Sequence, residues 1–186
     1  MVRRSGEVES MRPRVVAGVS GRPDSPAVLQ RAAAEARLRG AELLAVMAWD
    51  IPGADGGGRH GVGFSSSLPQ CRADGAERLR DALGAAFGAP GAGVPVTGRA
   101  VRGTPGAVLV DAVGAEDVLL VVGTGSRNAL HRFLWPSVAR HCLAHAPCPV
   151  LAVPPSPLRT ALATARRRNA LGLRLDTREL TGPGGV

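Results

Sequence analysis

The sequence predicts an α/β protein built on a doubly wound, five-stranded parallel sheet with helices on both faces. Two observations lead to this prediction. Short apolar runs rich in valine alternate along the chain with longer segments of helical periodicity, an order that is typical of β-α-β units. The runs are apolar throughout, as expected for parallel strands that helices cover on both faces.

The first β-α-β unit lies near the start of the chain. Residues 14–20, RVVAGVS, form a compact valine-rich run that indicates a buried strand. The helix predicted over 25–40 has Ser25 as its N-cap and Pro26 at its first helical position. Residues 41–49 are again apolar and predict the second strand.

A glycine-rich connector and an amphipathic helix come next. Residues 50–69 hold many glycines and predict a connector without regular structure. Residues 70–88 repeat apolar side chains at helical spacing, with charged side chains turned elsewhere. Residues 94–101 then show a strand pattern again and predict the third strand.

The fourth strand follows a helix whose start is clearly marked. Residues 103–114 carry Thr104 as a predicted N-cap and Pro105 at the first helical position. Residues 116–123, EDVLLVVG, form the most continuously apolar strand pattern of the chain. We therefore expect this strand near the centre of the sheet.

The last α-β unit closes the predicted domain. A helix is expected over 136–146 with Pro136 at its first position, and a strand over 148–154. The sequence thus divides into an N-terminal tail, 1–13, an α/β domain, 14–155, and a basic C-terminal tail, 156–186.

The formal charge of +8 is concentrated outside the predicted domain. Residues 158–186 carry six arginines against two acidic residues. With few aromatic side chains to stack on bases, this charge does not predict specific nucleic-acid binding.

Membrane and secretory classes are not favoured. No apolar run approaches the roughly 20 residues that span a bilayer. Glu7, Glu9 and Ser10 stand where a signal peptide needs an apolar core. The chain has only three cysteines, an odd number that does not suggest a framework of disulfides. We therefore expect free thiols in a reducing compartment and a cytoplasmic protein.

Three stretches together resemble the single-domain members of the universal stress protein family. They are RVVAGVSGRPDSPAVLQRAAAEARLRGAELLAVMAW, VRGTPGAVLVDAVGAEDVLLVVG and PSVARHCLAHAPCPVLAVP. The resemblance covers most of residues 14–155. It implies the Rossmann-type fold called adenine nucleotide alpha hydrolase-like, a role in stress response, and a homodimer formed through the last strand, from Pro149 to Val153.

The nucleotide loop of this family is only partly present. In its nucleotide-binding branch the loop after the fourth strand follows G-x2-G-x9-G-[S/T]. Gly123 and Ser137 match that pattern, whereas Ser126 and Pro136 replace the second and third glycines. Ser20 stands where the family commonly has an aspartate near the adenosine.

The resemblance implies a site for ATP with magnesium bridged through the phosphates. Adenosine would lie between Ser20 and the backbone of Ala48. Loss of an N–H at Pro136 would cost about 1.5 to 3 kcal/mol if that N–H bonded a phosphate oxygen. The residues that would hold the phosphates are Gly123, Gly125, Ser126, Arg127, Ser137 and Val138.

Two functional hypotheses follow from these residues. In the first, the protein is a stress module that binds adenine nucleotide weakly and signals through its dimer or partner state. In the second, the ATP site is vestigial and the protein is a nucleotide-independent dimeric interaction module. No nucleophile-and-base arrangement is apparent, so neither hypothesis is enzymatic.

One cluster has a spacing compatible with zinc. His141 and His145 share a helical face, and Cys142 and Cys148 are close in sequence. Because Cys142 projects away from the two histidines and Cys148 precedes a buried strand, the sequence predicts a structural role and no metal.

Overall fold

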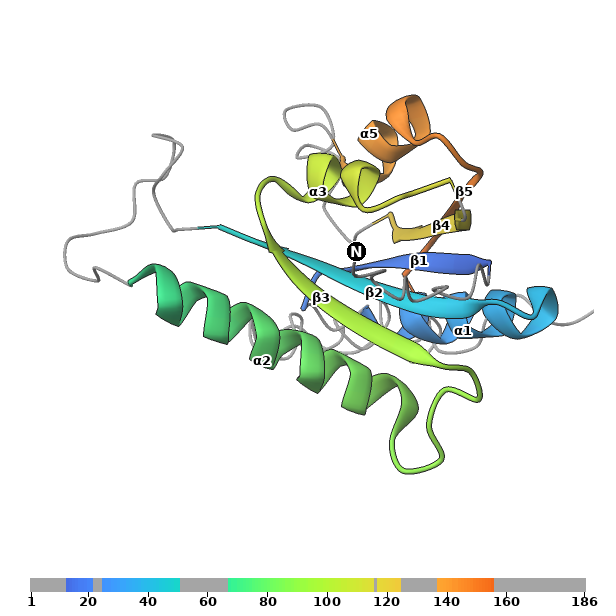
Figure 1. The fold of residues 1–186 in the computed structure, drawn as a ribbon, viewed down its shortest axis with the longest axis horizontal. Helices are drawn as coiled ribbons and strands as arrows, with labels where there is room; N and C mark the ends of the chain where they lie inside the picture. The colour runs from blue at the N-terminus through green and yellow to red at the C-terminus, as the bar shows by residue number, and fades with distance from the viewer. Residues whose placement is uncertain (1–12, 22–24, 51–66, 116, 125–136, 156–186) are drawn as a thin grey trace, which may run out of the picture. The chain divides into compact units, whose positions relative to one another are not determined.

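A computed structural model describes residues 13–21, 25–50, 67–115, 117–124 and 137–155 of the 186-residue chain. Strands and helices alternate along these residues, as predicted (Figure 1). The strands are β1 (Arg14–Val19), β2 (Glu42–Trp49), β3 (Val96–Arg102), β4 (Asp117–Gly123) and β5 (Val150–Val153). The helices are α1 (Ser25–Arg39), α2 (Leu68–Phe87), α3 (Pro105–Asp111) and α5 (Val138–His145).

The chain divides into two compact units, Met1–Pro154 and Pro155–Val186. The named strands and helices all belong to the first unit. In the second unit only Pro155 is described, so the basic tail expected from the sequence lies outside the described residues. None of the described helices is long and apolar enough to span a membrane.

All five strands pair in parallel in the order β3-β2-β1-β4-β5. This order confirms the predicted doubly wound sheet, with β1 at its centre between β2 and β4. Parallel neighbours need a crossover connection, and the helices supply it. Helices α1 and α2 lie on one face of the sheet, and α3 and α5 lie on the other (Figure 1).

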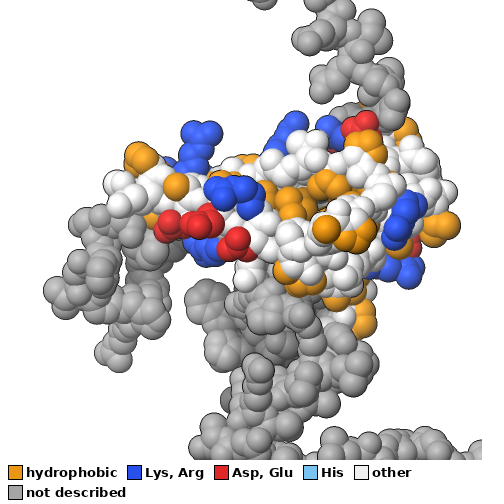
Figure 2. Space-filling model, turned by 90° about the horizontal axis from the view of Figure 1, so that it is seen from below, with side chains coloured by type: hydrophobic (Ala, Val, Ile, Leu, Met, Phe, Trp, Pro, Cys, Tyr) orange, Lys and Arg blue, Asp and Glu red, His pale blue; other side chains and the backbone are white. Residues whose placement is uncertain are grey.

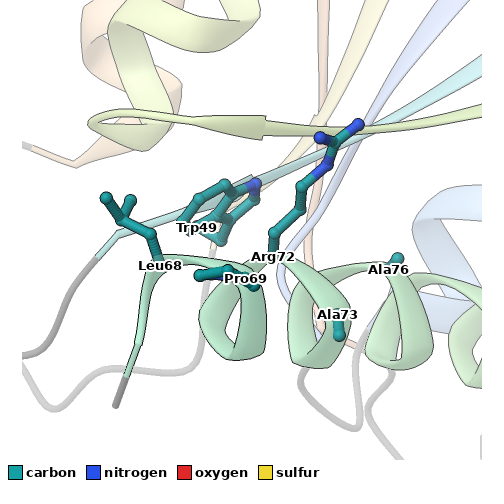
Figure 3. A pocket seen from close by; sticks show the side chains of 6 residues that line it. All are labelled: Trp49, Leu68, Pro69, Arg72, Ala73 and Ala76. Carbon is teal, nitrogen blue, oxygen red and sulfur yellow. The ribbon is translucent and has the colours of Figure 1, made fainter. Parts of the chain in front are cut away.

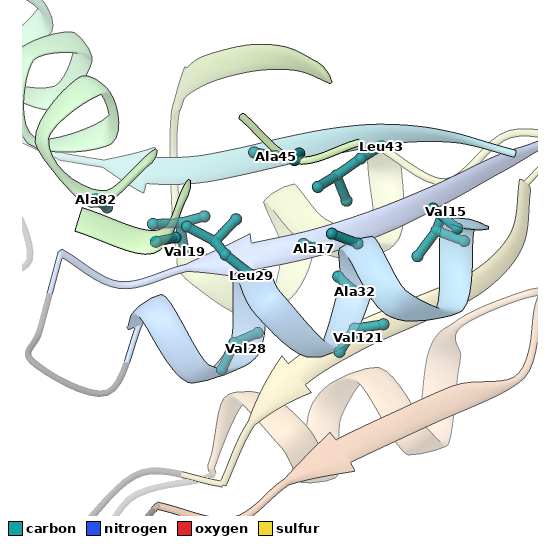
Figure 4. Packing of buried hydrophobic residues seen from close by; sticks show 14 of the residues in the cluster. Val15, Ala17, Val19, Val28, Leu29, Ala32, Leu43, Ala45, Ala82 and Val121 are labelled. Atoms are coloured by element: carbon teal, nitrogen blue, oxygen red, sulfur yellow. The ribbon is translucent and has the colours of Figure 1, made fainter. Parts of the chain in front are cut away.

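Alternate residues of β1 contribute to two separate cores. Val15 and Ala17 pack with α1 in the first core, whereas Val16 faces α3 and α5 in the second. All three side chains are fully buried. Figure 4 shows how closely the small side chains of α1, such as Ala32, approach the strands. A strand covered on both faces is apolar throughout, which explains the sequence pattern.

Three helix starts differ from the sequence prediction. Helix α1 begins at Ser25 itself, so Pro26 occupies its second position and not its first. Helix α5 begins at Val138 with Ser137 as its N-cap, so the prediction of Pro136 at the first helical position was wrong. Helix α2 begins at Leu68, earlier than predicted, because Ser67 caps it through Gln70.

A partly buried ion pair joins the starts of β1 and β4. Arg14 donates from Nε to Oδ1 of Asp117 at 2.8 Å and from Nη2 to Oδ2 at 3.1 Å. The Asp117 side chain is 0% exposed, and it also accepts the N–H of Gly114 at 2.6 Å. This carboxylate therefore links β1, β4 and the turn before β4.

Replacing Asp117 by alanine should strongly destabilise the domain. The substitution removes two charge-assisted hydrogen bonds from Arg14 and leaves the Gly114 N–H without its acceptor, which costs about 2 kcal/mol or more. Urea unfolding of Asp117→Ala should show this loss. The matched control is Asp81→Ala, which removes an exposed aspartate of α2 and should change stability by less than about 0.5 kcal/mol. Equal effects of the two substitutions would contradict this role of the pair.

An acidic side chain on α1 is buried between two arginines. Glu35 pairs with Arg31 at 2.6 Å and, through its other oxygen, with Arg39. The hydrogen bond from Arg39 is the main cause that holds the pKa of Glu35 below its usual value of 4.5. Since the three residues are spaced four apart, the cluster stabilises successive turns of α1.

The Glu35 cluster should make stability dependent on pH in the acidic range. Because the folded-state pKa is lowered, the stabilisation is complete above pH 4.5 and is lost as the pH falls through the folded-state value. The difference in unfolding free energy between the natural chain and Glu35→Gln should therefore shrink below pH 4.5. The same comparison with Glu77→Gln, an exposed acid outside any ion pair of the described residues, should not show this change. A difference for Glu35→Gln that stays constant with pH would refute the assignment.

Candidate functional site

The carboxyl ends of the parallel strands meet at one edge of the sheet. Ligands of doubly wound sheets bind outside this edge, where the chain switches from one side of the first strand to the other. In the register of β1 and β2, Val19 lies beside Met47. Ser20, the first residue after β1, therefore lies beside Ala48, which is still paired with Val101 of β3 near the end of β2.

The end of β4 lies on the other side of β1. Ala17 pairs with Val121, so Gly123 lies two residues further along, level with Val19. The structure thus brings the ends of β2, β1 and β4 together, as the sequence prediction requires of Ala48, Ser20 and Gly123. The switch point lies between β1 and β4.

The hydroxyl of Ser20 is directed to the start of α1. Its Oγ lies 3.1 Å from the Oγ of Ser25, and its backbone N–H donates to the same atom at 3.3 Å. Ser25 is 2% exposed, whereas Ser20 is exposed. A hydroxyl group both donates and accepts, and that of Ser20 belongs to an exposed residue at this edge.

Ser137 and Val138 form the start of α5. The Oγ of Ser137 accepts the backbone N–H of Arg140 at 3.1 Å and so caps the helix. Capping uses one acceptor position of the hydroxyl and leaves its proton available to bond an anion. The first N–H groups of a helix have no intrahelical acceptor and lie at the positive end of its dipole. The start of α5 therefore combines two features that favour a phosphate.

Three residues of the sequence-predicted site, Gly125, Ser126 and Arg127, lie outside the described residues, as does Pro136. Gly123 and Ser137, which flank them, are described, and Thr124 donates its N–H to Val153 at 3.0 Å. The two ends of the predicted phosphate loop are therefore defined.

Sequence reasoning did not identify Arg78 as part of this edge. A β-carbon at Gly21 would lie 3.7 Å from both Cβ and Cδ of Arg78, so the side chain of this α2 residue rests beside the turn after β1. Gly21 has φ of +65°, which suits glycine. Only the packing of α2 on α1 brings Arg78 here, and no sequence motif signals that contact.

The histidine and cysteine cluster has structural roles. The rings of His141 and His145 stack with centroids 4.4 Å apart, and His145 Nδ1 lies 2.9 Å from the carbonyl oxygen of His141. Cys142 is fully buried, and burial raises the pKa of its thiol. Among the described residues, no three His, Cys, Asp or Glu side chains come together as metal ligands.

Charges of both signs share the face of the molecule that carries α2. Figure 2 shows arginine side chains next to acidic ones on this face, with apolar side chains between them. The described residues of this face therefore form no continuous basic surface of the kind that binds a nucleic-acid backbone.

The fold and the polar strand ends define an α/β protein of the doubly wound, Rossmann-like architecture. Comparison with known proteins agrees: the model of the universal stress protein family matches residues 11–154. The chain belongs to this family, as its sequence resemblance suggested. No curated protein matches it.

Solved structures of universal stress proteins share the fold. One in complex with cAMP is 27% identical, with a TM-score of 0.58, and the match covers 78% of this chain and 98% of that one. UspA from Lactobacillus plantarum is 22% identical, with a TM-score of 0.54 and coverage of 76% and 98%. A protein from Archaeoglobus fulgidus in complex with dAMP is 23% identical, with a TM-score of 0.51 and coverage of 76% and 96%.

Proposed function

We propose that this protein is a stress-response module that binds an adenine nucleotide weakly at the carboxyl edge of its sheet. The observation that carries the proposal is the convergence of Ser20, Ala48 and Gly123 at the ends of three neighbouring strands. Helix α5 starts from the same edge because it connects β4 to β5. The relative of 27% identity that was solved with cAMP supports an adenine nucleotide as the ligand.

Each end of the ligand has its own set of partners in this proposal. The adenosine lies between Ser20 and the backbone of Ala48. The phosphates, with bridging magnesium, face the loop after β4 and the start of α5. Backbone N–H groups and a hydroxyl bind there without any covalent step. The phosphate partners are Gly123, Gly125, Ser126, Arg127, Ser137 and Val138.

Binding, not catalysis, is the proposed activity. The sequence offers no G-x-S-x-G elbow, and Ser137 already serves as a helix cap. Nucleotide occupancy would then act by changing the dimer or partner state. Ser126 and Pro136 make the site weaker than one with both glycines.

Calorimetric titration with MgATP tests this proposal. The natural chain should bind saturably, and Ser126→Gly/Pro136→Gly should bind roughly 10- to 150-fold more tightly because it restores a backbone donor and turn freedom. Ser137→Ala should weaken binding by about 10-fold through loss of a charge-assisted hydrogen bond. Its matched control is Ser67→Ala, which removes the N-cap serine of α2 and should leave affinity unchanged.

Two results would count against nucleotide binding. If the natural chain binds nothing and only the glycine variant binds, the ATP site is vestigial and the dimeric interaction module is correct. If neither binds, adenine nucleotide is not the ligand of this edge.

A homodimer through β5 is part of both hypotheses. Strand β5 forms one edge of the sheet, and its four side chains are only half-buried in the single chain. Leu143, on the adjacent helix α5, is 62% exposed. An edge strand presents unpaired backbone groups, and the exposed leucine adds apolar surface beside it. These features favour pairing with a second copy of the chain.

Proline on β5 should prevent this dimer. The carbonyl groups of Pro149 and Val153 accept hydrogen bonds from β4 and from the residue that follows it. Backbone groups of successive strand residues point to opposite sides, so the N–H of Ala152 points away from β4. Ala152→Pro removes that outward N–H and should lower the dimer fraction in sedimentation analysis. Ala100→Pro is the matched control on β3, the opposite edge strand. The Gly103 N–H donates to the Trp49 carbonyl of β2, so by the same alternation the backbone N–H of Ala100 points away from β2. Loss of the dimer in both variants, or in neither, would argue against β5 as the interface.

A further inference from the structure

A pocket of about 600 Å³ lies between the end of β2 and the first turns of α2 (Figure 3). This volume is within the range of pockets that bind small molecules. Most of its lining is apolar, with one guanidinium group at its side. The lining residues are Trp49, Leu68, Pro69, Arg72, Ala73 and Ala76.

The aromatic wall of the pocket carries an unsatisfied donor. The Nε1–H of Trp49 is buried, and it has no hydrogen-bond partner in the part of the chain that the structure describes. The indole is held against α2, since a β-carbon at Gly75 would lie 3.1 Å from two of its atoms. Tryptophan N–H groups that are buried usually find an acceptor. An acceptor atom delivered by a ligand would satisfy this one.

A second polar group of the pocket also lacks a partner. Arg72 is exposed and, within the described residues, makes no ion pair. In Figure 3 the nitrogen-bearing edge of the Trp49 indole is turned toward the Arg72 side chain. The nearby carboxylate of Asp50 is already paired with Arg102 at 3.7 Å. The pocket therefore offers a donor and an uncompensated positive charge on one side of an apolar cavity.

The pocket lies at the same carboxyl edge as the proposed nucleotide site, but on the face of the sheet that α2 covers. Trp49 packs on Gly75 of α2, whereas the preceding Ala48 packs with the core of the opposite face. Arg72, Ala76 and Leu79 follow one another at helical spacing along one flank of α2, and Leu79 packs at Gly98 of β3. The pocket thus lies toward the β3 side of α2 and does not include the Ala48 side chain.

We propose that this pocket binds a small amphipathic carboxylate with an aromatic body. The carboxylate would accept from the Trp49 Nε1–H and pair with the Arg72 guanidinium. The aromatic body would pack against the apolar side chains of Leu68, Pro69 and Ala76. Charge-assisted hydrogen bonds are about twice as strong as neutral ones, so Arg72 contributes most of the selectivity for an acid over a neutral analogue.

The experiment uses the indole N–H itself as the reporter. The chain has two tryptophans, so Trp135→Phe leaves a single indole signal in a nitrogen–proton correlation spectrum. Titration with 2-naphthoate should shift the Trp49 signal downfield and saturate. Arg72→Gln should weaken binding at least about 10-fold, because a hydrogen bond to a charged group is lost. Arg80→Gln removes an exposed, unpaired arginine from the same helix and should leave affinity unchanged.

Three further arms decide between this ligand class and its alternatives. The neutral analogue 2-naphthalenemethanol should bind more weakly than 2-naphthoate, and Arg72→Gln should not affect it. Added MgATP should not displace 2-naphthoate. Absence of a saturable shift, equal effects of Arg72→Gln and Arg80→Gln, equal affinity for the alcohol, or displacement by MgATP would each overturn the proposal. The arms without MgATP do not depend on whether the nucleotide edge binds ATP.

Discussion

The parallel pairing of β1 with both β2 and β4 is the constraint on which the rest of the structure depends. Parallel neighbours cannot be joined by a tight turn, so a helix must cross the sheet between them. Every crossover returns the chain to the same starting edge, and all strand ends gather at the opposite edge. The candidate site exists because of this geometry, since residues from separate parts of the sequence leave the sheet together.

Close contact between helices and the sheet depends on small residues at particular positions. Gly18 lies in β1 beneath α3, and a β-carbon there would come within 2.7 Å of Leu109. Gly75 plays the same part for α2, whose first turns lie against Trp49. The same close fit that positions α2 also creates the pocket on its flank. The contact of α2 with Trp49 thus both stabilises the helix on the sheet and forms one wall of the pocket.

The polar groups at the sheet edge serve the fold and remain suited to a ligand. Ser137 caps α5 and keeps its proton, while Ser20 contacts Ser25 and stays exposed. A site of this kind is largely preformed, because the helix start is stabilised with or without an anion. In the proposed function, Ser126 and Pro136 weaken nucleotide binding, while the Ser137 cap of α5 does not depend on a ligand.

Local sequence patterns alone determined the order of strands and helices. Valine-rich runs such as residues 14–20 and helix signals such as Thr104 with Pro105 are local, so they predict elements reliably. The candidates Ser20, Ala48 and Gly123 were also predictable, through the family resemblance and the rule that ligands bind at strand ends.

Only the tertiary structure decided which side chains meet across elements. Arg14 pairs with Asp117, and Arg78 lies beside Gly21, although the members of each pair are far apart in the chain. Packing of Trp49 against α2 likewise buries its indole N–H, which has no partner among the described residues. Such contacts depend on how helices pack on the sheet, and no local pattern encodes that packing.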